Sequence, residues 1–239
     1  MKSNRGMAAI LALLALVIVA APSSAQVCNG QLVKFDACAY AWETNYTPYI
    51  SQAGSQLEFV GKVSQFCPPL GLNAADPTKE YTFDVFGLTA SAMTTVTVFP
   101  DRTIYDTNYS SGGPVQFRIY EDPSMDTPAN CALPPNPPNA AVPSTFQNGT
   151  VILEGTITGF HTRVTILNAG GRSGVFNSTY AFTGGTHLSD VVACGGNFGG
   201  SWDPAPGIAG YSAHPNGKWD CPATPAVPST WGHVKTIYR

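Results

Sequence analysis

The chain has 239 residues, of which 11% are charged, with 24 Gly, 20 Pro and 6 Cys. Beyond residue 25 it holds five Lys and five Glu against 23 Thr, a balance that disfavours long solvated helices and suits β-branched, turn-rich chains. Glycine follows no three-residue period, which excludes collagen, and a 44% share of hydrophobic residues excludes a disordered chain. These numbers predict a folded, mostly β protein.

The first 25 residues have the pattern of a secretory signal peptide. Lys2 and Arg5 precede an apolar run of 15 residues, 7–21, which is shorter than the roughly 20 residues of a permanent membrane helix. Small residues then lead to a cleavage point after Ala25. An uncleaved N-terminal anchor is the alternative. We expect a mature chain of residues 26–239 that is secreted and extracellular, with the periplasm as the other location.

The charge of the mature chain excludes two kinds of partner. Without Lys2 and Arg5, ten basic residues face 15 acidic residues, a formal charge of −5. Such a chain has no basic surface for nucleic acid and no polybasic patch for an anionic membrane. We therefore expect no nucleic-acid partner, and no membrane association after the signal peptide is removed.

Six cysteines lie in the mature part, and an even number in an oxidising compartment favours three disulfides. They are Cys28, Cys38, Cys67, Cys131, Cys194 and Cys221. Spacing suggests local bridges Cys28–Cys38 and Cys194–Cys221, which leaves Cys67 to pair with Cys131. A zinc site is disfavoured because no two cysteines are separated by two to four residues.

Strands are indicated by alternating or β-branched segments. Tyr81, Phe83 and Val85 alternate with polar residues, and the dipeptide Pro100-Asp101 suits a turn between two strands. The predicted strands cover residues 57–63, 81–86, 94–99, 102–109, 115–120 and 174–183. A short helix is predicted over 186–193, whereas residues 37–42 suit either a strand or a helical turn.

Three further segments are assigned from glycine and proline. Residues 150–167 are predicted to form a hairpin with Thr158-Gly159 as its turn, which places Glu154 opposite Arg163. A glycine-rich loop is expected over 195–200, and Asn216-Gly217 suits a second hairpin turn. The proline-rich stretch 123–143 is predicted to be a long loop.

The fold class that follows is all-β. We expect a single antiparallel β-sandwich or partly closed β-barrel with disulfides and at most one or two short helices. One domain is preferred to two, because neither half of the chain has an obvious complete core.

Four blocks of the sequence, residues 113–126, 143–160, 174–192 and 210–220, resemble exported β-rich bacterial proteins of undetermined function. The resemblance covers roughly half of the mature chain and consists of strand and turn patterns. It implies export and a β architecture, and it supplies no catalytic residues.

No recognised catalytic motif is present: there is no nucleophile elbow, His-Glu-x-x-His zinc motif, phosphate loop or dinucleotide fingerprint. The acidic group Glu121, Asp122 and Asp126 offers hard oxygen ligands of the kind that Ca²⁺ prefers. Ordinary turn chemistry is the alternative interpretation of these residues. Calcium is the one cofactor that the sequence raises.

Aromatic residues gather in the C-terminal part. Trp202, Tyr211, Trp219 and Trp231 are candidates for stacking on a sugar or inserting into a protein partner. The alternative is that these rings cap the end of the β core.

The leading functional hypothesis is a secreted, non-catalytic binding protein or a component of the cell-envelope or extracellular matrix. Its partner would be a polysaccharide or another extracellular protein. One alternative is a secreted hydrolase that cleaves carbohydrate through an unidentified carboxylate pair. The other is a filament or surface-layer subunit, which predicts an exposed sheet edge or a large apolar patch.

Overall fold

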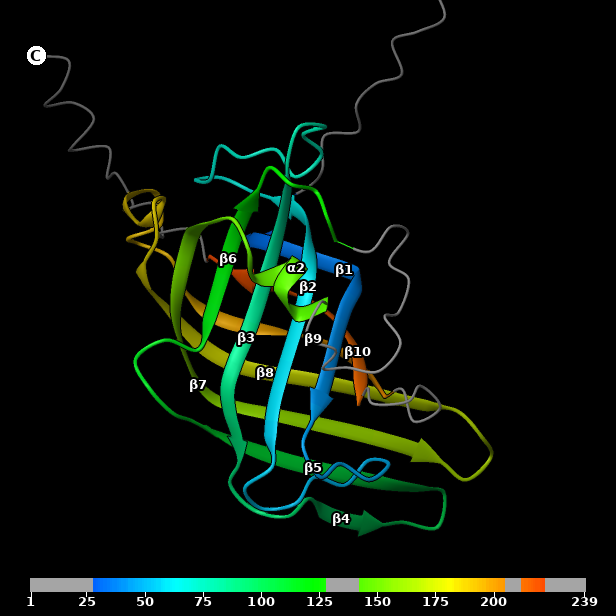
Figure 1. Cartoon of the computed structure of the whole chain (residues 1–239). Helices are drawn as coiled ribbons and strands as arrows, with labels where there is room; N and C mark the ends of the chain where they lie inside the picture. Colours follow the sequence, from blue (N-terminus) through cyan, green and yellow to red (C-terminus); the bar gives the residue numbers. More distant parts are fainter. Residues whose placement is uncertain (1–27, 128–141, 205–211, 222–239) are drawn as a thin grey trace, which may run out of the picture.

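The computed structural model describes residues 28–127, 142–204 and 212–221 (Figure 1), so the predicted signal peptide lies outside the described residues. The strands in these ranges are β1 (Gln31–Glu43), β2 (Gln56–Phe66), β3 (Glu80–Ala90), β4 (Thr95–Val98), β5 (Arg102–Ser111), β6 (Phe117–Asp122), β7 (Thr150–Leu167), β8 (Arg172–Gly184), β9 (Gly195–Pro204) and β10 (Ala213–Asp220). The helices are α2 (Val142–Gln147) and one 3-10 turn (Leu188–Asp190). No helix in the described ranges is long and apolar enough to cross a membrane.

The strands form one antiparallel sheet that closes on itself. Strand β2 pairs with both β1 and β3, so the described strands make a ring in the order β1, β2, β3, β6, β7, β8, β9, β10 and back to β1. This confirms the all-β prediction and selects the barrel over the sandwich. Closure leaves the ring itself without a free edge.

Strand β5 takes over from β6 at one end of the barrel. The 18-residue β7 pairs with β6 along its first half and with β5 along its second half. Strand β3 also changes its partner: residues 80–85 pair with β6, and the last residues, Leu88–Ala90, pair with β5. Strand β4 pairs with β5 alone among the described strands, so it forms an open edge of the sheet.

The barrel is filled by aromatic side chains. Tyr81, Phe83 and Val85 of β3 point inward, as their alternation predicts, and all three are buried. Other strands contribute rings in the same way, and Phe198 stacks on Trp219 with ring centroids 4.4 Å apart. Fully burying a side chain of this size stabilises the fold by about 1.5–3 kcal/mol. The interior is therefore a packed core and not a channel.

A second, smaller core lies on the outside of the barrel. Helix α2 crosses β2 and β3 (Figure 1), and Phe146 packs there against Tyr40, Trp42 and Val60. The backbone oxygen of Phe146 accepts a hydrogen bond of 2.9 Å from Thr82 Oγ1. The sequence placed this segment partly in the proline-rich loop, and α2 was not predicted.

Most of the predicted strands are confirmed. Residues 57–63, 81–86, 94–99, 102–109, 115–120 and 174–183 fall mainly within β2, β3, β4, β5, β6 and β8. Residues 37–42, left open between strand and helical turn, belong to β1. The helix predicted over 186–193 is reduced to the single 3-10 turn.

The predicted hairpin over 150–167 is wrong, because β7 runs straight through Thr158-Gly159. Gly159 has φ +66 and lies where the β7–β8 register shifts, so it forms a bulge. Glu154 and Arg163 consequently pair with other strands and not with each other. Glu154 binds Arg118 of β6, and Arg163 binds Asp106 of β5.

The glycine-rich loop over 195–200 and the turn at Asn216-Gly217 are also wrong, since both segments lie inside strands β9 and β10. These glycines permit close approach of two backbones. A Cβ on Gly200 would lie 1.9 Å from the backbone oxygen of Asn216, and one on Gly217 would lie 2.6 Å from that of Gly199. Glycine at a tight strand contact has the same sequence signature as glycine in a turn.

Two disulfides are described, Cys28–Cys67 and Cys194–Cys221. The second confirms the prediction, whereas the first shows that the pairings Cys28–Cys38 and Cys67–Cys131 are wrong. Cys28 precedes β1 and Cys67 follows β2, so the pairing of these strands brings the two residues together. Cys38 lies within extended β1, far along the strand from Cys28. It is also disulfide-bonded, and no cysteine in the described ranges is free.

Candidate functional site at one end of the barrel

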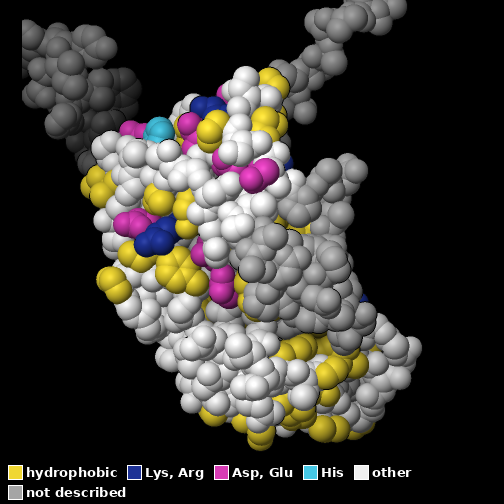
Figure 2. All heavy atoms as spheres, in the orientation of Figure 1, with side chains coloured by type: hydrophobic (Ala, Val, Ile, Leu, Met, Phe, Trp, Pro, Cys, Tyr) yellow, Lys and Arg dark blue, Asp and Glu magenta, His cyan; other side chains and the backbone are white. Residues whose placement is uncertain are grey.

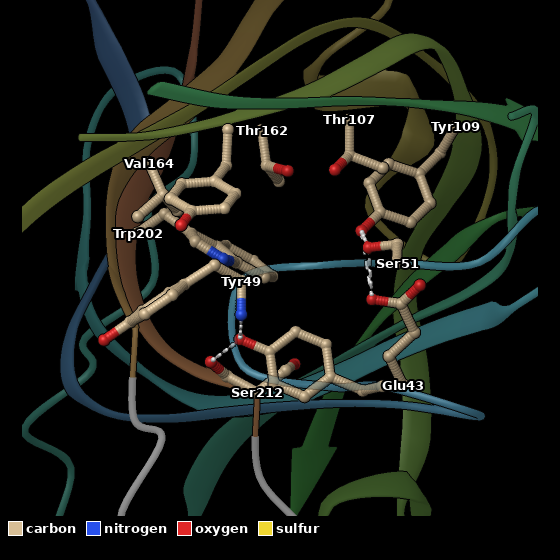
Figure 3. A pocket seen from close by; sticks show the side chains of 11 residues that line it. Glu43, Tyr49, Ser51, Thr107, Tyr109, Thr162, Val164, Trp202 and Ser212 are labelled. Carbon is tan, nitrogen blue, oxygen red and sulfur yellow. Dashed lines mark hydrogen bonds between the residues drawn. The ribbon is translucent and has the colours of Figure 1, made fainter. Parts of the chain in front are cut away.

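One end of the barrel carries a small polar pocket (Figure 3). We call it the mouth pocket and define it by Glu43, Ser51, Thr107, Tyr109, Thr162 and Trp202. Its walls come from β1, β5, β7 and β9, and the loop between β1 and β2 folds over it. The cavity volume is about 10 Å³, about the room that a single water molecule needs.

The polar layer of this pocket follows from the alternation of β5 and β7. Phe160, Thr162 and Val164 of β7 all face inward and are buried. Thr107 and Tyr109 of β5 face inward beside them, and the Tyr109 ring lies 5.6 Å from that of Phe160. A layer of hydroxyl groups therefore lies directly on the aromatic core.

The hydroxyl groups converge on Glu43, the last residue of β1. Ser51 Oγ donates to Glu43 Oε2 over 2.9 Å, and Tyr109 OH donates to the same oxygen over 3.2 Å. The two hydroxyl oxygens lie 3.0 Å apart, and Figure 3 shows this cluster at one side of the pocket. Glu43 Oε1 is buried without a hydrogen-bond partner among the described residues.

The environment of Glu43 favours its protonated form. Burial raises the pKa of its carboxyl group to about 7, although the hydrogen bonds from Ser51 and Tyr109 act in the opposite direction. No Lys, Arg or His lines the described part of the pocket to hold the charged form. Burial also raises the pKa of Tyr109. Near neutral pH, Glu43 can both donate and accept a proton, while Tyr109 remains a phenol.

Two tyrosines of the β1–β2 loop cover the pocket. Tyr46 OH accepts a hydrogen bond of 2.9 Å from the Tyr49 backbone N–H and donates to the backbone oxygen of Ser212 over 3.4 Å. Tyr49 has φ 68, in the left-handed region that non-glycine residues seldom adopt. Its ring packs on Tyr105 with centroids 5.4 Å apart. The loop thus holds the Tyr49 ring across the mouth at a cost in backbone energy.

An open groove lies on the other side of Tyr49. We call it the rim groove and define it by Tyr49, Ile166, Leu167, Gly170, Gly171 and Arg172, where β7 turns into β8. Its volume is about 380 Å³, within the range of small-ligand sites. Tyr49 lines both the mouth pocket and the rim groove.

The predicted aromatic binding residues are placed differently from expectation. Trp219 is 0% exposed in the centre of the core, where its ring stacks on Phe198. Trp202 is buried and lines the mouth pocket. Tyr211 and Trp231 lie outside the described residues. The sequence pattern that could have found the mouth is the pair Tyr46 and Tyr49 in a loop between two strands.

The predicted acidic group is only partly assembled. Asp122 and Asp126 come together with Glu80, with one carboxylate oxygen from each within 4.8 Å of the others. Glu121 is not part of this cluster. It accepts hydrogen bonds from Lys79 Nζ over 3.0 Å and from Tyr81 OH over 2.9 Å. We call Glu80, Asp122 and Asp126 the acidic cluster; it lies at the end of the barrel opposite the mouth.

A second pair of carboxyl groups lies beneath α2. Gln147 Nε2 donates to Glu58 Oε1 over 2.9 Å and to Asp84 Oδ2 over 3.0 Å. Burial raises the pKa of both carboxyl groups, and for Asp84 the charge of Glu58 adds to the effect. Asp84 is buried and Glu58 is half-buried, and both are bound by Gln147 at the end of α2. A substrate has no direct access to Asp84 in this arrangement.

The chain matches no protein-family model, and no curated protein and no solved structure shows significant similarity to it. The resemblance to exported β-rich bacterial proteins therefore stays a prediction.

Proposed function

We propose that this chain is an exported, non-catalytic binding protein that takes a polyhydroxylated ligand, such as a segment of polysaccharide, at its mouth. The observation that carries the proposal is Tyr49, held in a costly backbone conformation between the mouth pocket and the rim groove. Strained residues of this kind cluster at ligand sites, where the fold fixes a side chain for contact.

The chemistry of the mouth suits a neutral, hydroxyl-rich ligand. Tyr49 and Tyr105 offer aromatic faces at the rim, and hydroxyl groups lie just inside. Glu43 can donate or accept a hydrogen bond near neutral pH because its pKa is about 7. The disulfides support export, since such bridges persist in oxidising compartments.

The placement of the carboxyl groups favours binding over hydrolysis. Glycoside cleavage uses two carboxyl groups on either side of the bond, about 5–10 Å apart. In the described part of the mouth, Glu43 is the one carboxyl group. Glu58 and Asp84 form a close pair, but Asp84 is buried and Gln147 of α2 binds both carboxyl groups. This arrangement supports a site that holds a sugar without cleaving it.

The test is a binding and turnover screen on a panel of soluble polysaccharides. Wild-type protein should bind at least one polysaccharide and leave the mass distribution of that polysaccharide unchanged. Tyr49→Ala should weaken that binding about tenfold, the effect of roughly 1.4 kcal/mol of lost ring contact. Phe86→Ala is the matched control, because this aromatic side chain lies on the outer wall against Arg118. Turnover of any polysaccharide, or unchanged affinity in Tyr49→Ala, would contradict the proposal.

A second candidate function, a subunit of a filament or surface layer, is favoured by strand β4. All four of its residues are exposed, and Val98 at its end is 74% exposed. Figure 2 shows hydrophobic side chains gathered at the lower end of the molecule, where Figure 1 draws β4 and β5. An uncovered apolar edge is a template for pairing with another chain. Sedimentation should then show concentration-dependent assembly that Val98→Lys abolishes, whereas a wild-type monomer at all concentrations would exclude it.

A further inference from the structure

The acidic cluster begins with two buried carboxyl groups that face each other across paired strands. Glu80 is the first residue of β3 and Asp122 the last of β6, and the two form a directly opposed pair in the ladder. They are 2% and 1% exposed. Like charges in directly opposed positions repel each other, and the repulsion grows when water is excluded. Such a pair needs positive charge between or beside its members.

Among the described residues, a positive charge is paired with Glu80 but not with Asp122. Glu80 Oε2 lies 2.6 Å from Lys62 Nζ, and Thr127 donates to both Glu80 oxygens. Within the described ranges, Asp122 Oδ1 accepts one hydrogen bond, from the backbone N–H of Ser124 over 2.8 Å. Asp122 Oδ2 is buried and has no hydrogen-bond partner among the described residues. Buried charged groups are normally paired or bound to a metal ion.

Two more oxygen-bearing side chains, those of Asp126 and Asn148, belong to this end of the barrel. Asp126 follows Met125, whose φ of 51 turns the chain back, and its carboxylate oxygen lies within 4.8 Å of those of Glu80 and Asp122. Asn148, just after α2, has its Nδ2 3.2 Å from both Asp126 oxygens. Its Oδ1 is buried and has no partner within the described ranges.

Gly149 allows the segment that carries Asn148 to lie close to the end of β6. It has φ +88, and a Cβ at this position would lie 2.4 Å from the backbone oxygen of Glu121 and 3.0 Å from Asp122 Cα. The backbone after α2 therefore lies directly against the end of β6. This contact joins residues from β3, β6, the following loop and the segment after α2 around one point.

We propose that the acidic cluster, together with Asn148 Oδ1, is a calcium-binding site. Ca²⁺ takes oxygen ligands at 2.3–2.6 Å, so donors on opposite sides of the ion lie about 4.6–5.2 Å apart. The carboxylate oxygens lie within 4.8 Å of one another, so a single ion can contact all three. Mg²⁺ demands a near-ideal octahedron, whereas Ca²⁺ accepts an irregular set of oxygen ligands. Calcium is therefore the better fit for donors that come from separate elements.

The charge of the site also suits a divalent cation. Three carboxylates carry −3, and Lys62 returns +1 through its contact with Glu80, which leaves −2. The ion would satisfy the free Asp122 Oδ2, and a half-turn of the Asn148 amide about its last bond would present Oδ1 in place of Nδ2. Because the ligands come from separate elements, the ion would fasten the segment after α2 to the barrel wall.

The experiment measures calcium binding and thermal unfolding of the full mature chain. Protein freed of metal with a chelator is dialysed against ⁴⁵Ca²⁺, and its unfolding temperature is followed with added CaCl₂, MgCl₂ or EGTA. Wild type should bind about one Ca²⁺ per chain and unfold at a higher temperature with Ca²⁺ than with EGTA. An equal shift with Mg²⁺ would overturn the assignment to calcium, and the absence of ⁴⁵Ca²⁺ binding would overturn the site.

The variants test the position of the site. Asp122→Asn should lose the calcium shift, and in EGTA it should unfold at a higher temperature than wild type, because it removes an unpaired buried charge. Asp126→Asn, at an exposed position, should lose the shift without affecting folding in EGTA. Glu121→Gln is the matched control, adjacent to Asp122 but bound to Lys79 and Tyr81, and should keep the shift. A shift retained in both Asn variants, or lost in Glu121→Gln, would overturn the proposal.

Discussion

Glu43 at the mouth and Glu80 at the opposite end of the barrel are both withdrawn from water, but they have different partners. Glu43 receives hydrogen bonds from two neutral hydroxyl groups, and burial raises its pKa to about 7. Burial acts on Glu80 in the same direction, yet the hydrogen bonds from Lys62 and Thr127 outweigh it and lower the pKa of that carboxyl group. Hydroxyl donors compensate only part of the cost of burial, whereas a cation maintains the charge.

This contrast separates the chemistry of the two ends. The mouth holds a carboxyl group that is neutral in mild acid and charged in mild base, which suits a neutral ligand. Glu80 at the opposite end keeps its charge over the same range, which suits a cation. Substitutions that remove the individual partners of Glu43 and Glu80 test this difference.

The largest effect is expected from Lys62→Met, which leaves Glu80 buried without its cation. We expect the free energy of unfolding at pH 7 to fall by about 3 kcal/mol. This value is at the lower end of the range for a broken buried ion pair, because Lys62 is partly exposed. Urea denaturation in the presence of EGTA measures it. Lys34→Met is the control, since Lys34 and Asp36 form an exposed pair that contributes at most about 1 kcal/mol. Equal losses in both variants would remove the distinction drawn for Glu80.

A smaller effect concerns the pH dependence of stability. The pKa of Glu43 is raised in the folded state to about 7, so folding takes up a proton, and this contribution is lost as the pH rises through 7. Between pH 5.5 and 8, wild type should lose about 2 kcal/mol that Glu43→Gln does not lose, from 1.36 kcal/mol per pH unit. Urea denaturation across this range, with the two proteins in parallel, measures the difference. Parallel pH profiles would show that Glu43 titrates normally.

The smallest effect is expected from Tyr109→Phe, which removes one donor to Glu43. The free energy of unfolding should fall by about 1 kcal/mol at pH 7. The pH at which the Glu43 contribution disappears should rise, because the lost hydrogen bond favoured the charged carboxylate. Tyr105→Phe is the matched control, since the Tyr105 hydroxyl makes no hydrogen bond within the described ranges. A downward shift of that pH in Tyr109→Phe would contradict the assigned role of the hydroxyl group.

The sequence predicted the parts of the fold that depend on local alternation. Tyr81, Phe83 and Val85 are buried as expected, because a period of two places them on one face of any strand. Gly159 and Gly217 misled the interpretation, because glycine serves a tight turn, a bulge such as that at Gly159 and a close strand contact such as that at Gly217 equally well. The deciding atoms belong to distant residues, such as the backbone oxygen of Gly199 beside Gly217. Cysteine spacing failed for the same reason, since Cys28 meets Cys67 through strand pairing.

The residues of the candidate sites also fall into those that local sequence identified and those that it missed. Asp122 and Asp126 were identified because one short loop holds both. Glu80 was missed, because only the β3–β6 register brings it opposite Asp122. Glu43 and Tyr49 were missed because closure of the barrel gathers their neighbours from β5, β7 and β9. Pairing between strands distant in sequence is therefore the information that the sequence patterns lacked.

The most direct test of the contrast between the two ends is a carbon NMR titration of the glutamate side chains. The chain has five Glu residues, so selective labelling yields about five carboxyl signals, and Glu43→Gln and Glu80→Gln assign the two signals of interest. We expect a pKa of about 7 for Glu43 and a pKa below the usual glutamate range for Glu80. Titration of both groups together near the ordinary glutamate pKa would contradict it.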